Sequence, residues 1–171
     1  MKSILVVLAP ENFRDIEYIV PRAFFEQAGH TVMTTSTQKK SIGKHGYRVE
    51  NDLLLTHAQE KDFEGIFFVG GLGSLIYKEN QTAHDLVNNF IRKEKTIGAI
   101  CAAPRSFLQW GILKGKWCTG HDWDGNFAHL CESSGALYDP KDVVVDGKIV
   151  TANGPEAAES CALQFLKVLS S

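Results

Sequence analysis

Residues 96–104 read Thr96-Ile97-Gly98-Ala99-Ile100-Cys101-Ala102-Ala103-Pro104, a run of small and apolar side chains that stops at a proline. The first five residues predict a strand that is covered on both faces. Pro104 suits the first turn of a helix, where its missing N–H group has no cost. Apolar residues at helical spacing follow up to Trp110, and Gly111 ends the pattern. We therefore predict a buried strand that turns directly into a helix.

Cys101 lies at the corner between this strand and this helix, with alanines on both sides. A strand-to-helix corner with small neighbours is typical of a nucleophile elbow. The N–H groups at the start of a helix also favour a thiolate. A free cysteine is, however, often a small buried hydrophobic residue. The corner alone leaves both interpretations open.

Strands and helices alternate on either side of this corner. Ile4 to Ala9 predicts a buried strand, Asp15 to Gln27 a helix that ends at Gly29, and His30 to Ser36 a second strand. Further segments predict strands at 64–69 and 116–119, a hairpin at 143–151 with an Asp-Gly turn, and helices at 82–95, 123–132 and 156–169. This alternation predicts an α/β fold, a three-layer sandwich around a mostly parallel sheet.

Two details complete the expected fold. Residues 41–55, with Gly43 and Gly46 at a turn, predict a small hairpin excursion at the sheet edge. In the helix from Asp15, Ile16 and Ile19 belong to the apolar set that we expect to face the core.

Composition limits the classes of function. A chain of 171 residues predicts a single domain, residues 1–171. The net charge of −2 and the lack of a basic stripe argue against a nucleic-acid partner. The apolar run at Ile4 to Ala9 is too short for a membrane span. The four scattered cysteines predict reduced thiols and a cytoplasmic location, with Cys118, Cys131 and Cys161 as core thiols.

Four features fall where predicted strands end. They are Glu17, Gly70-Gly71, Cys101 and His121. Ligands of open α/β sheets bind at the carboxyl ends of the strands, so we expect these features to lie together. Cys101 would be the nucleophile, Glu17 and His121 would move protons, and backbone N–H groups of Gly70, Gly71 and Ala102 would hold an oxyanion.

Each feature also has an ordinary explanation. A glutamate in the first helical turn stabilises the helix dipole, Gly-Gly is a common turn, and a loop histidine is usually solvated. A rival interpretation groups Cys118, His121, His129 and Cys131 as a zinc site. Residues i and i+3 on a strand face opposite ways, and the second pair has the wrong spacing, so we expect no metal.

Together, several motifs resemble the ThiJ/PfpI superfamily, and most closely its branch containing the Parkinson-disease-associated protein deglycase. They are Ala99 to Pro104, His121, Glu17 in Glu-Tyr-Ile-Val-Pro, Val69-Gly70-Gly71 and Asn153-Gly154-Pro155. The resemblance implies a flavodoxin-like sandwich, a homodimer, and Cys101, Glu17 and His121 as the reactive residues. The sequence has no phosphate loop and no Rossmann fingerprint, so we expect no cofactor. The protease-like branch has a histidine after the cysteine, where this chain has Ala102, and Asp122 stands where the deglycase branch often has proline.

Three hypotheses of function follow from the motifs and the resemblance. The first is a cysteine-dependent glyoxalase or deglycase that acts on a small reactive carbonyl, for example converting methylglyoxal to lactate. The second is a redox-responsive stress or chaperone-like protein in which Cys101 is oxidised to a sulfinate. The third is a cysteine peptidase or amidase. Fold alone does not choose among them.

Overall fold

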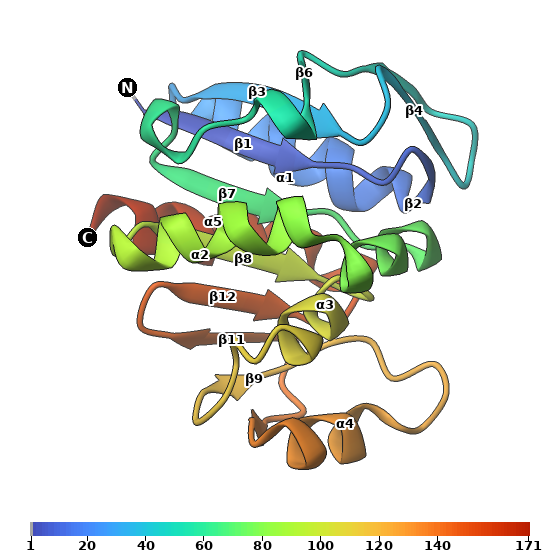
Figure 1. Ribbon diagram of the computed structural model, residues 1–171, viewed down its shortest axis with the longest axis vertical. Helices are drawn as coiled ribbons and strands as arrows, with labels where there is room; N and C mark the ends of the chain where they lie inside the picture. Colours follow the sequence, from blue (N-terminus) through green and yellow to red (C-terminus); the bar gives the residue numbers. More distant parts are fainter. Residues whose placement is uncertain (1) are drawn as a thin grey trace.

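A seven-stranded sheet forms the centre of the molecule in the computed structural model, which describes residues 2–171. The strand order is β11-β12-β8-β7-β1-β3-β6, and only β11 pairs antiparallel with its neighbour. The strands are β1 (Ser3–Val7), β3 (Thr31–Ser36), β6 (Leu53–Leu54), β7 (Gly65–Phe68), β8 (Thr96–Ile100), β11 (Val143–Asp146) and β12 (Ile149–Ala152). Strands β1, β7, β8 and β12 run the same way, so their carboxyl ends share one edge (Figure 1).

Helices cover both faces of this sheet. The helix α1 (Asp15–Gln27) packs beside α5 (Ala158–Ser170) behind the sheet, and α2 (Gln81–Arg92) and α3 (Pro104–Gln109) lie in front (Figure 1). The 3-10 helices are η1 (Leu55–His57), η2 (Glu60–Asp62), η3 (Leu72–Glu79) and η4 (Pro155–Ala157). This is the α/β sandwich with a mostly parallel sheet that the sequence predicts, and its flavodoxin-like form is confirmed.

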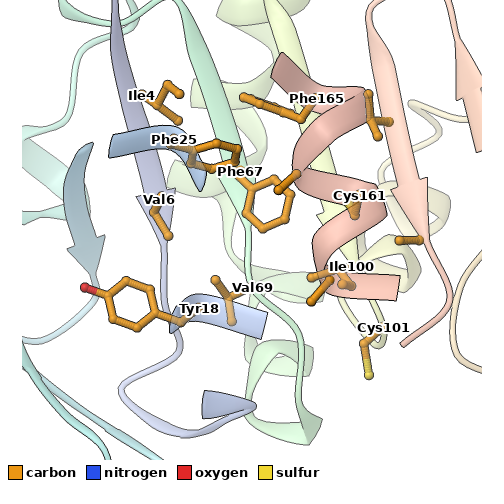
Figure 2. Close-up of a cluster of buried hydrophobic side chains, with 14 of the residues drawn as sticks. Ile4, Val6, Tyr18, Phe25, Phe67, Val69, Ile100, Cys101, Cys161 and Phe165 are labelled. Atoms are coloured by element: carbon orange, nitrogen blue, oxygen red, sulfur yellow. The ribbon is translucent and has the colours of Figure 1, made fainter. Parts of the chain in front are cut away.

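Two apolar clusters, one on each face of the sheet, form the core. Ile4 and Val6 of β1 point into one cluster and Leu5 and Val7 into the other, because side chains alternate along a strand. The first cluster contains an aromatic group of Phe25, Phe67 and Phe165. Cys101 lies at the end of this cluster, beyond Ile100, with its sulfur turned away from the aromatic rings (Figure 2).

The excursion after β3 is more than a hairpin. Strands β4 (Lys40–Gly43) and β5 (Arg48–Glu50) form the expected antiparallel pair. They belong to a separate three-stranded sheet with β2 (Glu11–Phe13), a segment for which the sequence analysis predicted no strand. This small sheet places the segment before α1 next to the cavity described below.

The expected inward face of α1 is wrong, although the bounds of the helix are right. Ile16 is 46% and Ile19 41% exposed, whereas Glu17 and Tyr18 are buried. The helix turns Glu17 toward Cys101 and Gly70, and both of these residues lower the pKa of its carboxyl group. Apolar periodicity therefore predicted the wrong buried face of α1, because the polar residue Glu17 is buried at the site.

The segment that carries His121 also differs from the expectation. Strand β9 (Trp117–Cys118) pairs with β10 (Leu137–Tyr138) in a two-stranded sheet of its own, so His121 does not follow a strand of the main sheet. The helix expected at 123–132 begins later, as α4 (Phe127–Ser134), whose first amide donates to Asp122 Oδ1 (2.7 Å). Within residues 2–171, no helix combines the length and the apolar character needed to cross a membrane.

Candidate active site

Cys101 has the backbone conformation of a nucleophile elbow. Its φ angle is +63°, in the left-handed region that side chains other than glycine rarely adopt. Two hydrogen bonds hold it there: its N–H group donates to Ala152 O (2.8 Å), and its carbonyl accepts from the amide of His121 (2.8 Å). The thiol therefore stands on a strained corner that neighbouring segments keep in place.

Glu17 brings a carboxyl group to this corner from α1. The side chain is fully buried, and neither of its oxygens has a partner within hydrogen-bonding geometry. Burial raises the pKa of Glu17 to about 7. The Cys101 thiol, the positive charge of Arg14 and the Gly70 amide lower this pKa, but only in part. A buried carboxyl group without full partners is costly to fold, which marks it as a candidate for chemistry.

Gly70 is the reason that Glu17 and Cys101 can meet. A Cβ atom at Gly70 would lie 2.5 Å from Glu17 Oε2 and 2.6 Å from Cys101 Cβ, closer than packed atoms approach. The space above this glycine is thus filled by the glutamate and the cysteine together. Only glycine lets β7 lead into the site at this distance.

The pKa of the Cys101 thiol is raised to about 12, chiefly by burial and by the negative charge of Glu17. Amide groups of Gly71 and Ala102 act in the opposite direction. The amides at the helix start favour the thiolate, as the sequence predicts, but burial and Glu17 have the larger effect on the pKa.

His121 reaches the site on the loop between β9 and α4. Its Nδ1 lies 3.1 Å from Asn153 O, so we assign the proton to Nδ1, which leaves the lone pair on Nε2. The imidazole ring is exposed to solvent. The amide of His121 is the group that binds the carbonyl of Cys101, which joins the loop to the elbow.

A cavity of about 640 Å³ opens over these residues. It is lined by Asn12, Arg14, Glu17, Lys44, Gly71, Leu72, Gly73, Cys101, Ala102, His121, Trp123, Pro155 and Glu156. Five of the six candidate site residues from the sequence line it; Gly70 does not, since it lies beneath Glu17. A volume of this size suits a small-molecule ligand.

Several cavity residues escaped the sequence analysis. Arg14 and Lys44 bring positive charge from before α1 and from after β4, and Trp123 comes from the His121 loop. None carries a motif of its own. Pro155 belongs to the Asn-Gly-Pro motif, which was the one available signal for this side of the cavity.

Arg105, on the helix after the elbow, holds the His121 loop. Its guanidinium binds both oxygens of Asp124 (2.6 and 2.9 Å) and lies 3.7 Å from the ring centre of Trp123. It also donates to His121 O (3.3 Å). The side chain is only 8% exposed, so these contacts replace its hydration. One arginine thus connects the cysteine helix with the histidine loop.

The other cysteines are buried, as expected for core thiols. Cys118 and Cys131 lie together, but His121 faces Asn153 and His129 is exposed beside Glu132. Among residues 2–171, no three metal-ligating side chains cluster. The rival grouping of four zinc ligands does not form.

Comparison with known proteins places the chain in a family. The model of the DJ-1/PfpI family matches residues 2–168. The chain belongs to the DJ-1/PfpI family. The resemblance to the ThiJ/PfpI superfamily and its deglycase branch is thereby confirmed.

Relatives within the DJ-1/PfpI family carry different names. The chain is 28% identical to the deglycase PfpI of Pyrococcus furiosus, over 96% of this chain and 98% of that protein. It is 29% identical to YraA of Bacillus subtilis, provisionally named a cysteine protease, over 99% of both chains. A solved ThiJ/PfpI domain protein from Brachyspira murdochii superposes with a TM-score of 0.92 at 29% identity, covering 98% of this chain and 96% of that one. The names make an enzymatic activity plausible without selecting a reaction.

Proposed function

We propose that this chain is a cysteine-dependent enzyme that acts on small reactive carbonyls, as a cofactor-free glyoxalase or as a deglycase. The observation that supports this most directly is the buried, unpartnered carboxyl group of Glu17 against the Cys101 thiol. A base with a pKa of about 7 is well matched to proton transfer near neutral pH. A relative that matches the chain over nearly its full length is named a deglycase, which is consistent with this proposal.

In the proposed reaction, the sulfur of Cys101 attacks the aldehyde carbon of methylglyoxal while Glu17 accepts the thiol proton. The product is a hemithioacetal. His121 and Glu17 then move a proton from the former aldehyde carbon to the neighbouring carbonyl carbon, and the hydroxyl proton passes to the oxygen of that carbonyl, which gives a thioester of lactate. Water cleaves the thioester, releasing lactate and restoring the thiol. Overall, methylglyoxal and one water become lactate, with no net oxidation.

Amide groups of Gly71 and Ala102 are the proposed donors to the developing oxyanion, since both act on the Cys101 sulfur and line the cavity. The sequence also predicts Gly70 as a donor, but the Gly70 amide lowers the pKa of Glu17 rather than that of the Cys101 sulfur. The cavity of about 640 Å³ exceeds the needs of a three-carbon aldehyde. A carbonyl adduct on a larger amine or thiol, the substrate of a deglycase, therefore also fits.

The test is lactate formation from methylglyoxal by the wild-type chain and by Cys101→Ser. We expect the variant to lose the activity, and equal rates would refute the proposal. The value of kcat/KM should rise with pH through a midpoint near 7, because the ionised form of Glu17 is the base. Glu17→Gln should lower the rate about 100-fold or more and remove this pH dependence.

A second candidate function is a redox-responsive protein in which Cys101 is oxidised to a sulfinate. The amides of Gly71 and Ala102, which favour negative charge on the sulfur, support it. It predicts the gain of two oxygen atoms on Cys101 under mild peroxide, with no turnover of aldehydes. A peptidase has less support, because Ala102 follows the cysteine.

We also propose that the chain forms a homodimer in the cytoplasm. Ile16 and Ile19 of α1 and Leu72 and Ile76 of η3 are apolar and exposed, and η3 packs against the β2 segment that precedes α1. Exposed apolar side chains gathered on neighbouring elements are typical of an interface. The four free cysteines are consistent with a reducing compartment.

A further inference from the structure

Cys118 and Cys131 form a pair of buried sulfur atoms outside the cavity. Their Sγ atoms are 3.7 Å apart, and both side chains are fully buried. The two cysteines come from β9 and α4 and are 13 positions apart in the chain. A disulfide has its sulfurs about 2 Å apart, so a further approach of less than 2 Å would be enough to form one.

The elements that carry the pair lie at the margin of the molecule. Figure 1 shows β9 and α4 at one end, beyond β11 and β12. Strand β9 has two residues and α4 has eight, and neither belongs to the seven-stranded sheet. Short peripheral elements open locally more easily than a central sheet. Such opening gives a small oxidant access to sulfurs that are covered in the closed structure.

The two sulfurs differ in their electrostatic surroundings. The contact between them lowers the pKa of Cys131, to which the positive charge of Arg105 also contributes, and raises that of Cys118. Cys131 is therefore the sulfur that becomes a thiolate first, and Cys118 is the neighbouring thiol. A nucleophilic thiolate beside a second thiol is the arrangement that forms a disulfide.

We propose that Cys118 and Cys131 are a redox-active pair that a hydroperoxide oxidises to an intramolecular disulfide, independently of Cys101. The Cys131 thiolate attacks one peroxide oxygen, the O–O bond breaks, and water leaves after protonation. The sulfur of Cys118 then attacks the resulting sulfenic acid, forms the S–S bond and releases a second water. Two thiols are oxidised and one hydrogen peroxide is reduced to two waters.

The disulfide would close a loop that contains His121 and Asp124. In the reduced chain, hydrogen bonds of Arg105, Asp122 and Asn153 hold this loop. Cross-linking its two ends restricts the unfolded chain and so favours the folded one. The oxidised protein is therefore expected to melt at a higher temperature than the reduced protein.

The test uses full-length Cys101→Ser, which leaves three of the four cysteines, and hydrogen peroxide well below the melting temperature. Free thiols are alkylated in denaturant afterwards, and the intact mass and the peptides are measured. We expect one alkylated thiol, at Cys161, and a linked pair of peptides that contain Cys118 and Cys131. Reduction with dithiothreitol should restore three. The wild-type chain should give the same linked pair by peptide mapping.

Matched variants separate this pair from other thiol chemistry. Adding Cys161→Ser should leave the cross-link intact, whereas adding Cys131→Ser or Cys118→Ser should abolish it. The proposal is wrong if Cys101→Ser keeps three alkylated thiols at peroxide levels that oxidise wild-type Cys101. It is also wrong if the cross-link involves Cys161 or joins two chains. These results depend on no enzymatic assay.

Discussion

At the scale of single residues, Glu17 differs most from its ordinary state. A glutamate in the first turn of a surface helix would be solvated and ionised, but this one has no exposed surface. Burial raises its pKa from 4.5 to about 7. The folded chain therefore keeps a proton on Glu17 at pH values where the unfolded chain has lost it, and this has a cost for stability.

The sign of this cost gives a prediction. Since the folded state binds more protons between pH 4.5 and 7, the contribution of Glu17 to the free energy of unfolding falls as pH rises through that range. The full fall corresponds to about 3 kcal/mol. Glu17→Gln removes it, so the variant should gain stability relative to wild type at pH 8 but not at pH 4. Urea denaturation at both pH values measures the difference.

Glu159→Gln is the control for this measurement, because Glu159 is an exposed glutamate in the first turn of another helix, α5. It should follow the wild-type pH profile closely. If Glu17→Gln showed the same stability difference from wild type at pH 4 and at pH 8, the carboxyl group would not be held neutral by the fold.

At the scale of elements, the elbow works because β8, α3 and the His121 loop are joined. The strand β8 ends at Ile100, Cys101 turns the chain, and α3 carries Arg105 to the loop. The contacts of Arg105 need its planar guanidinium, since it both binds a carboxylate with two nitrogens and lies over an indole. Lysine has the charge without this geometry.

Arg105→Lys should therefore loosen the loop and lower kcat for methylglyoxal about 10-fold or more, since small displacements of a catalytic group are costly. The rate at which iodoacetamide alkylates Cys101 should change much less than kcat, because the elbow keeps its hydrogen bond to Ala152. Asp124→Asn should have the same pattern. If kcat and the alkylation rate fell by the same factor, the substitution would have caused a general structural defect instead.

Gly98 tests the packing of β8 against α5. A Cβ atom there would lie 2.7 Å from Phe67 Cδ2 and 2.8 Å from Phe165 Cδ2. Gly98→Ala should therefore destabilise the protein by about 1–3 kcal/mol in urea denaturation. Phe165→Leu removes one of the two obstructing rings, so adding Gly98→Ala to it should cost less. Additive effects in this double-mutant cycle would contradict the steric explanation.

At the scale of the whole molecule, α1 and η3 carry exposed apolar residues, and one of these residues lines the cavity that holds Cys101. Leu72 is 61% exposed and is itself a lining residue. A surface of this kind is unfavourable in water unless a partner covers it. We expect that partner to be a second copy of the chain, as the family resemblance implies.

Leu72→Glu should consequently shift the chain from dimer to monomer, as measured by analytical ultracentrifugation at micromolar concentration. Val145→Glu is the matched control, since Val145 is also exposed but lies on the edge strand β11, away from α1 and η3. A wild-type chain that sediments as a monomer would refute the dimer. Dissociation by both variants would place the interface elsewhere.

The pattern of residues by itself determined the alternation of strands and helices, the parallel sheet and the corner at Cys101. These features depend on local signals, because apolar runs, a helix-starting proline and an Asp-Gly turn act over a few residues. The same signals predicted that Glu17, Cys101 and His121 lie together. The three residues do line one cavity, but His121 reaches it on a loop after β9, which lies outside the main sheet.

Only the tertiary structure decided which polar groups the core accepts. Helical periodicity predicted that Ile16 and Ile19 face the core. In the structure they are exposed, and Glu17 is buried against Gly70 instead. Three further features depend on contacts between segments that are distant in the chain. They are the raised pKa of Cys101, the hydrogen bonds of Arg105 to the His121 loop, and the contact of Cys118 with Cys131. Burial and charge at such contacts depend on atoms from several elements at once, and no local pattern of residues records them.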